Sequence, residues 1–394
     1  MKKLSLLFSV LIMSGCSLFG ADEDDAAITP AELVDFSPEV TLKRTWSTSV
    51  GSGNKNYLIT LRPAGGTDVV FAADYSGVIT ALDVKDGSKI WDVDLDTALT
   101  GGVGYGFGMV MVGTIDGIVH ALDSEDGSSI WTQQVSSEVL SSPKTNGQIV
   151  VVHSIDNQMV ALSAEDGEEI WRHNGDAPIL SVRGTSESIV TSNMVISGFD
   201  SGKLISFNAG NGSINWETRL ALPKGKTELE RMVDIDGEPI LVGDVVYAAS
   251  YQGRISAVSR GTGRNLWSQD ASSHNAPAHN DGQIYISGAE DSVEAYASGS
   301  GQLNWSNDQL FLRRLTGPAV LGSTIAVADS EGFLHLLDSS DGHFVGRTKV
   351  HGSGVSSPLL SLNDQLIIQA NNGHYLLGLS TVSYTHLTLP TRLS

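Results

Sequence analysis

The chain has 394 residues, a formal net charge of −21 and an apolar content of 41%. Its length allows two or three domains, but its charge argues against nucleic acid or an anionic membrane surface as the main partner. The 43 glycines and the modest 18% of charged residues are typical of many short strands joined by tight turns. We therefore expect an all-β fold with a solvated acidic exterior.

The N-terminus predicts an export signal that ends at a lipid anchor. Two lysines precede the run LSLLFSVLIM, which is too short to span a bilayer. The run ends in MSGC, residues 13–16, which resembles a bacterial lipobox with Met13 in place of the usual leucine. We therefore expect residues 1–15 to be a lipoprotein signal peptide and Cys16 to carry lipid. The alternative is an ordinary cleaved signal with an incidental cysteine.

Residues 16–38 are expected to be a flexible tether behind the lipidated Cys16. The segment GADEDDAAITPAE is acidic and poor in apolar side chains. In lipoproteins of the enterobacterial type, a residue other than Asp after the cysteine implies passage to the outer membrane, and Ser17 stands there. Because Cys16 is the only cysteine, no disulfide can form within the chain.

From residue 39 to residue 380 the chain repeats one phrase about every 40 residues. The clearest copies are SGVITALDVKDGSKIW at 76–91 and DGIVHALDSEDGSSIW at 116–131. The run VITALD alternates as a strand does, DG makes a tight turn, and the next strand ends in tryptophan. Two further apolar runs precede each phrase, so each period holds four short antiparallel strands. This arrangement is the blade of a β-propeller.

The repeat predicts eight blades and the way in which the ring closes. Runs of the VITALD type occur eight times, but the last, HYLLGL at 374–379, has no tryptophan strand after it. The strand around Trp46, conversely, has no such run before it. We therefore expect the N-terminal strand to complete the last blade, which leaves no free sheet edge within the ring. Residues 381–394 carry no blade pattern and are expected to be a non-native or disordered tail.

The recurring tryptophans are expected to be structural. The pattern from Ala81 to Trp91 resembles the docking motif of quinone-dependent dehydrogenases, which are eight-bladed propellers whose tryptophans wedge between blades. We assign that role to Trp46, Trp91, Trp131, Trp171, Trp216, Trp267 and Trp305. A buried tryptophan covers much surface and pairs its N–H with an acceptor.

The same resemblance raises the alternative of a quinoprotein enzyme, which the residues do not favour. That family needs bound calcium, a catalytic Asp and often a disulfide of adjacent cysteines, and this chain has one cysteine. The DIDGEP segment at 234–239 lacks the further ligands of a calcium loop. The ten histidines show no metal-binding spacing. We therefore expect no catalytic residues, no metal and no cofactor.

Two insertions after tryptophan strands interrupt the repeat. The first adds five residues within 173–190, and the second adds about eleven within ALPKGKTELERMVDIDGEP at 221–239. Insertions in repeat folds lie in loops, and both should emerge on one face, one blade apart. Apolar residues beside an arginine and carboxylates suit a protein-binding site. An internal ion pair of Arg183 with one of these aspartates, which would only order the loops, is an equal alternative.

With these insertions the chain resembles the BamB family, the outer-membrane-protein assembly lipoproteins of Gram-negative bacteria. The resemblance covers residues 1 to about 380 and is most specific at ILSVRG and ERMVDIDGEP. It implies a non-catalytic scaffold that hangs from the outer membrane by Cys16 and faces the periplasm. Its implied partners are BamA and the rest of the Bam complex, with unfolded outer-membrane proteins as substrates.

The resemblance also implies which residues bind the periplasmic POTRA repeats of BamA. Carried over position by position, they are Leu180, Val182, Arg183, Asp234 and Asp236. Val182 stands where leucine is common, a change that keeps the apolar character. A general propeller adaptor for envelope polysaccharide or signalling is the remaining alternative.

Overall fold

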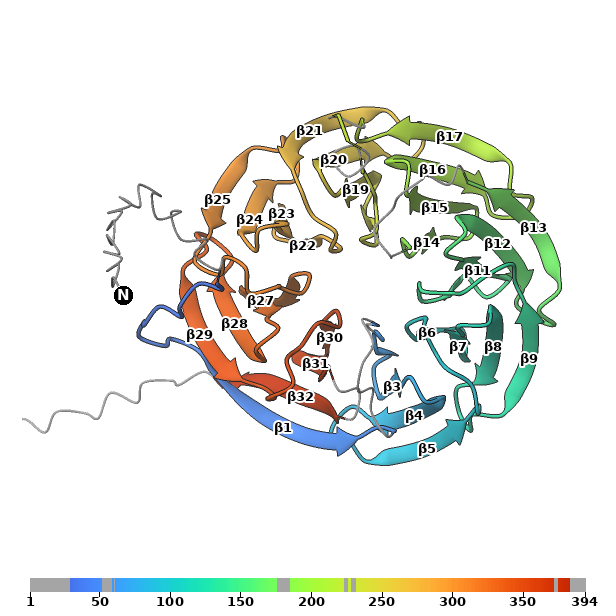
Figure 1. The fold of residues 1–394 in the computed structure, drawn as a ribbon, viewed down its shortest axis with the longest axis horizontal. Helices are drawn as coiled ribbons and strands as arrows, with labels where there is room; N and C mark the ends of the chain where they lie inside the picture. Colours follow the sequence, from blue (N-terminus) through green and yellow to red (C-terminus); the bar gives the residue numbers. More distant parts are fainter. Residues whose placement is uncertain are drawn as a thin grey trace, which may run out of the picture.

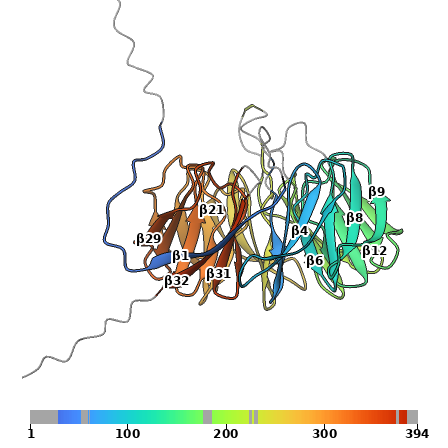
Figure 2. The ribbon, with the colours of Figure 1, turned by 90° about the horizontal axis from the view of Figure 1, so that it is seen from below.

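The computed structural model describes residues 29–51, 59, 61–175, 185–222, 226–227, 232–371 and 375–382. These residues form eight four-stranded antiparallel sheets arranged as blades around a central axis (Figure 1). Seen from the side, the ring is a flat disc (Figure 2). The prediction of an eight-bladed propeller is confirmed.

The first four blades follow the chain from the innermost to the outermost strand. Blade I consists of β2 (Ala64–Gly65), β3 (Val69–Ala73), β4 (Val78–Asp83) and β5 (Lys89–Asp94). Blade II consists of β6 (Gly104–Gly106), β7 (Met109–Gly113), β8 (Ile118–Asp123) and β9 (Ser129–Gln134). Blade III consists of β10 (Lys144–Thr145), β11 (Ile149–His153), β12 (Gln158–Ser163) and β13 (Glu169–Asn174). Blade IV consists of β14 (Ile189–Val190), β15 (Met194–Phe199), β16 (Lys203–Asn208) and β17 (Ile214–Arg219).

The next three blades repeat this order, and the last one takes its outer strand from the N-terminus. Blade V consists of β18 (Ile240–Val242), β19 (Val245–Ala249), β20 (Gly253–Ser259) and β21 (Asn265–Ala271). Blade VI consists of β22 (Ala278–Asn280), β23 (Gln283–Ser287), β24 (Val293–Ala297) and β25 (Leu303–Asn307). Blade VII consists of β26 (Ala319–Leu321), β27 (Thr324–Ala328), β28 (Phe333–Asp338) and β29 (Phe344–Lys349). Blade VIII consists of β30 (Leu360–Leu362), β31 (Gln365–Gln369), β32 (Tyr375–Val382) and β1 (Thr41–Ser49).

Each docking tryptophan joins its blade to the turn of the next one. Trp131, for example, donates from Nε1 to the carbonyl oxygen of Ala164 at 3.0 Å. Its ring lies over Gly167, whose φ of +77° suits the turn and where an added Cβ would lie 2.7 Å from the indole. All seven tryptophans donate in this way, with distances of 2.7–3.1 Å. The expected structural role of the tryptophans agrees with this geometry.

The ring closes where the chain ends meet. Strand β1 pairs with β32 from Thr41↔Val382 to Ser49↔Tyr375, and the two strands lie side by side in Figure 1. Trp46 in β1 then donates to the carbonyl oxygen of Val84 in blade I at 2.7 Å. The predicted closure is therefore confirmed. Strand β32 runs two residues beyond the predicted end at 380, because Thr381 and Val382 still pair with β1.

One blade junction has no tryptophan and is covered by the N-terminal segment instead. Gly346 stands at the tryptophan position of β29, and the carbonyl oxygen of Val40 lies where its side chain would be. The amides of Glu39 and Val40 both donate to the carbonyl oxygen of Val345, at 2.8 and 2.9 Å. We call residues 29–40 the strap.

The strap lies against blades VI and VII. The amide of Ala31 donates to the carbonyl oxygen of Phe311 at 2.9 Å, and Phe36 packs on Phe344 with ring centroids 5.6 Å apart. The last part of the predicted tether, residues 29–38, is therefore held against the disc rather than free. Residues 1–28, with Cys16, and the predicted tail beyond 382 lie outside the described residues. Within the described chain, no helix is long and apolar enough to cross a membrane.

Candidate functional site

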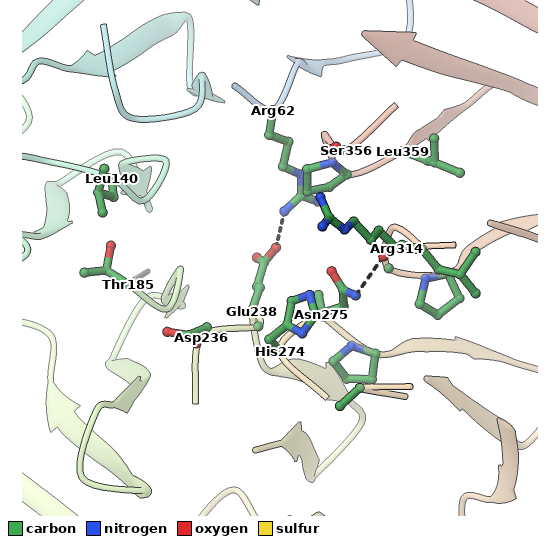
Figure 3. Close-up of a pocket in the computed structure, with 18 of the residues that line it drawn as sticks. Arg62, Leu140, Thr185, Asp236, Glu238, His274, Asn275, Arg314, Ser356 and Leu359 are labelled. Atoms are coloured by element: carbon green, nitrogen blue, oxygen red, sulfur yellow. Dashed lines mark hydrogen bonds and ion pairs between the residues drawn. The ribbon is translucent and has the colours of Figure 1, made fainter. Parts of the chain in front are cut away.

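One face of the disc gathers the eight loops that lead from an outer strand to the inner strand of the next blade. Together these loops line a cavity of about 730 Å³ on the ring axis, which we call the axial cavity (Figure 3). One lining residue from each loop, in chain order, is Ile59, Thr100, Leu140, Thr185, Asp236, Asn275, Leu312 and Pro358. Because every blade contributes, the cavity is a product of ring closure.

The two loops that carry the insertions meet at this cavity. The Ser186 hydroxyl, in the β13–β14 loop, donates to the carbonyl oxygen of Gly237, in the β17–β18 loop, at 3.2 Å. Thr185 and Asp236 beside them both line the axial cavity. The expectation that the loops share one face agrees with this contact. Three of the predicted partner-binding residues, Leu180, Val182 and Arg183, lie outside the described residues.

The other two predicted residues, Asp234 and Asp236, are less accessible than a surface site would require. Asp234 has 0% of its surface exposed. Both carboxylate oxygens of Asp236 are buried without a hydrogen-bond partner among the described residues. Burial, with the charges of Asp234 and Asp200, raises the pKa of Asp236 well above its usual value, which favours the protonated form. Asp236 lines the axial cavity, whereas Asp234 is fully buried and does not.

Four charged side chains tie four blades together beside the same cavity. Arg62 contacts Glu187 at 3.0 Å and Glu238 at 2.6 Å, and Lys144 contacts the same two carboxylates at 2.7 and 2.9 Å. Burial acts to raise the pKa of Glu187, but Lys144 and Arg62 outweigh it and lower that pKa to about 2. The Glu187 carboxylate raises the pKa of Arg62 in turn. We call these four residues the charge quartet.

Sequence reasoning did not find the charge quartet. Arg62, Lys144, Glu187 and Glu238 each lie just before or at the start of an innermost strand, in blades I, III, IV and V. The one sequence feature they share is their position at or just before an inner strand. Because all inner strands face the ring axis, this shared position could have indicated that the four side chains meet. Each cation contacts both carboxylates, so the quartet fixes the relative positions of blades far apart in sequence.

The described residues contain no group of three or more His, Cys, Asp or Glu side chains placed to bind a metal ion. The most suggestive pair, His335 and Asp329, lies 3.0 Å apart with both side chains fully buried. Arg313 and Arg347 occupy the remaining positions around this pair and donate to strap carbonyl oxygens of Ala31 and Val34. The two arginines therefore link this buried pair to the strap.

These features define a class: an eight-bladed β-propeller with docking tryptophans at seven blade junctions, in which described residues of the two insertion-bearing loops meet at the axial cavity. A family model described as "Outer membrane protein assembly factor BamB" matches residues 75–307 and 289–383. A relative of that name from Pseudomonas aeruginosa is 48% identical over 372 residues, covering 94% of this chain and 97% of the relative. The chain belongs to the BamB family of outer membrane protein assembly factors.

Solved structures agree with this assignment. BamB from Moraxella catarrhalis superposes with a TM-score of 0.80 at 26% identity, covering 86% of this chain and 100% of that one. A quinohaemoprotein alcohol dehydrogenase from Pseudomonas putida HK5 reaches a TM-score of 0.70 at 14% identity, covering 90% of this chain and 78% of that one. At that identity, the second likeness concerns the propeller fold alone.

Proposed function

We propose that the protein is a non-catalytic scaffold lipoprotein of the outer-membrane β-barrel assembly machinery. The lipid on Cys16 would anchor it to the outer membrane, where it faces the periplasm. There it would bind the POTRA repeats of BamA, join the rest of the Bam complex and assist the delivery and insertion of unfolded outer-membrane proteins. Membership in the family supports the general role, and the meeting of the two insertion loops supports the docking site.

The observation that carries the docking proposal is the contact between Ser186 and Gly237. It joins the β13–β14 loop to the β17–β18 loop, so residues about 50 positions apart form one surface. We assign BamA binding to Leu180, Val182 and Arg183 of the first loop, with Asp234 and Asp236 of the second. Because Asp234 is buried, its contribution would be to hold the second loop in position.

Calorimetric titration of the protein with the POTRA domains of BamA tests the proposal, using the parent and Arg183→Glu. We expect binding by the parent and a loss of at least about tenfold, or ~1.4 kcal/mol, in the variant. The matched control is Arg264→Glu, an exposed arginine in the β20–β21 turn, which should bind as the parent does. Equal binding by all three proteins would place the docking site elsewhere, and no binding by the parent would remove BamA docking from the proposal.

Delivery of substrates needs its own test. Photo-crosslinking groups placed at exposed positions around the disc, such as Ile130 and Leu266, should capture unfolded outer-membrane proteins during assembly. Outer strands present free edges to which an extended chain can add. If no position on either face or on the rim captures such a chain, the protein acts on BamA and not on the substrates.

A further inference from the structure

Arg314 lines the axial cavity, and its guanidinium group has no hydrogen-bond or ion-pair partner among the described residues. Its side chain is exposed and extends from the β25–β26 loop into the cavity (Figure 3). Arg62, the other arginine in the lining, is committed to Glu187 and Glu238. Arg314 makes no ion pair with any residue that the structure describes. A guanidinium group forms strong, often bidentate hydrogen bonds with carboxylates and phosphates.

The loop that presents Arg314 is held in an uncommon conformation. Leu312 and Arg314 both have a φ of +57°, in the left-handed region that side-chain-bearing residues rarely adopt. The Asp291 carboxylate accepts hydrogen bonds from the amides of Arg314 and Leu315, both at 2.7 Å. The Asn275 side-chain amide donates to the carbonyl oxygen of Leu315 at 3.3 Å. Such conformations persist only where the surroundings enforce them, and they concentrate at binding sites.

The cavity wall around Arg314 mixes polar groups with apolar side chains, and its acidic groups are occupied or favoured as neutral. Leu312, Leu315 and Leu359 lie among the lining residues. Asp291 is engaged by the two amides, and Glu238 belongs to the charge quartet. Burial lowers the pKa of His274 more than Asp291 raises it, which favours the neutral imidazole. The site therefore combines one available positive charge with hydrophobic surface, in a volume typical of ligand pockets.

We infer that the axial cavity binds the carboxyl terminus of an extended peptide that ends in an apolar residue. The carboxylate pairs with the Arg314 guanidinium, and the last side chain packs on the leucines of the wall. A chain terminus fits this geometry because it carries the carboxylate and an apolar side chain on the same Cα. The inference does not depend on BamA binding, because it concerns a different contact and a different ligand.

Titration of the full-length protein with acetyl-Gly-Leu-Ala-Leu tests the inference, followed by calorimetry and by saturation-transfer NMR of the peptide. We expect the peptide with a free carboxyl terminus to bind about tenfold more tightly than the same peptide with an amidated end. Arg314→Gln should abolish this preference. Arg264→Gln, an exposed arginine away from the cavity, should keep it.

A second peptide distinguishes the terminus from an acidic side chain. Amidated acetyl-Gly-Leu-Ala-Glu offers a carboxylate without a terminus, and we expect it to bind about tenfold more weakly than the free acid. Equal binding of this peptide would overturn the assignment to a chain terminus. Equal binding of the acid and the amide, retention of the preference by Arg314→Gln, or no binding by the parent at millimolar concentrations would overturn the inference as a whole.

Discussion

At the scale of single residues, the docking tryptophans should carry far more stability than their neighbours. Trp171 donates to the carbonyl oxygen of Ala209 at 2.8 Å and is 7% exposed, whereas the adjacent Ile170 is 45% exposed. We expect Trp171→Ala to lower the free energy of unfolding by about 3–5 kcal/mol. Ile170→Ala should lower it by less than about 1 kcal/mol. Urea denaturation measures both, and similar losses would contradict the role of the tryptophan as a joint between blades.

Glycines in the turns separate the effect of backbone conformation from that of the tryptophan contact. Gly261 has open space and no positive φ, Gly243 has open space and a φ of +59°, and Gly167 has a φ of +77° with Trp131 against it. Substitution by alanine should be nearly neutral at Gly261 and cost about 1–2 kcal/mol at Gly243. It should cost more at Gly167, because the indole must move as well. Thermal melts measure the three stability losses. Equal losses at Gly243 and Gly167 would show that the contact with Trp131 adds nothing to the cost of the substitution.

The raised pKa of Asp236 predicts that part of the folding stability is lost as pH rises. Since its pKa is raised by burial and then by Asp234 and Asp200, the folded protein binds this proton more tightly than the unfolded chain does. Its contribution to stability is therefore largest at low pH and falls as pH rises above about 4 toward the raised pKa. Asp236→Asn lacks this loss, so it should exceed the parent in stability at pH 7–8 and match it below about pH 4.

Unfolding in urea across this pH range checks the expectation for Asp236. The exposed Glu125→Gln serves as the control and should follow the parent throughout. An asparagine variant that is less stable than the parent at neutral pH would mean that the ionised carboxylate is stabilised in the fold.

At the scale of elements, the strap should behave as one unit whose attachment depends on Phe36. This ring packs on Phe344, and the Arg347 guanidinium lies 4.9 Å from its centroid while donating to the carbonyl oxygen of Val34 at 2.8 Å. Phe36→Ala should speed hydrogen exchange at the amides of Ala31, Glu39 and Val40 by about tenfold or more. Exposed Ser37→Ala should leave them unchanged. Exchange unchanged in Phe36→Ala would show that the hydrogen bonds hold the strap without the ring.

The elements also show which features a sequence can predict. The blades, the tryptophan joints and the ring closure could be predicted, because each depends on a local pattern repeated at a fixed offset. The attachment of the strap could not be predicted, because it depends on Arg313 and Arg347. These two arginines lie about 300 residues away in the sequence, and no repeated motif marks their positions. The same holds for the burial of Asp234, which depends on packing between neighbouring loops. No sequence motif marks Arg314 as a candidate site residue. Its placement in the cavity depends on a loop conformation that the Asp291 carboxylate holds through the amides of Arg314 and Leu315.

At the scale of the whole molecule, ring closure makes the last blade depend on the first residues of the fold. Within blade VIII, β1 contributes the outer strand and the Trp46 joint to blade I, and the strap covers the junction at Gly346. A variant that begins at residue 51 would therefore expose the edge of β32 and lose two adjacent junctions. We expect it to associate through that edge and to melt well below a variant that begins at residue 29.

Light scattering and thermal melts of the two truncated variants test this dependence, and adding back the missing piece sharpens it. A peptide of residues 29–50 should bind the shorter variant, return it to a monomer and raise its melting temperature, because the pairing partners in β32 are already in place. A shorter variant that is monomeric and as stable as the longer one would mean that the ring closes with a three-stranded blade VIII. The remaining tryptophan joints would then suffice for the ring, and the strap and β1 would serve only to connect the disc to its N-terminus.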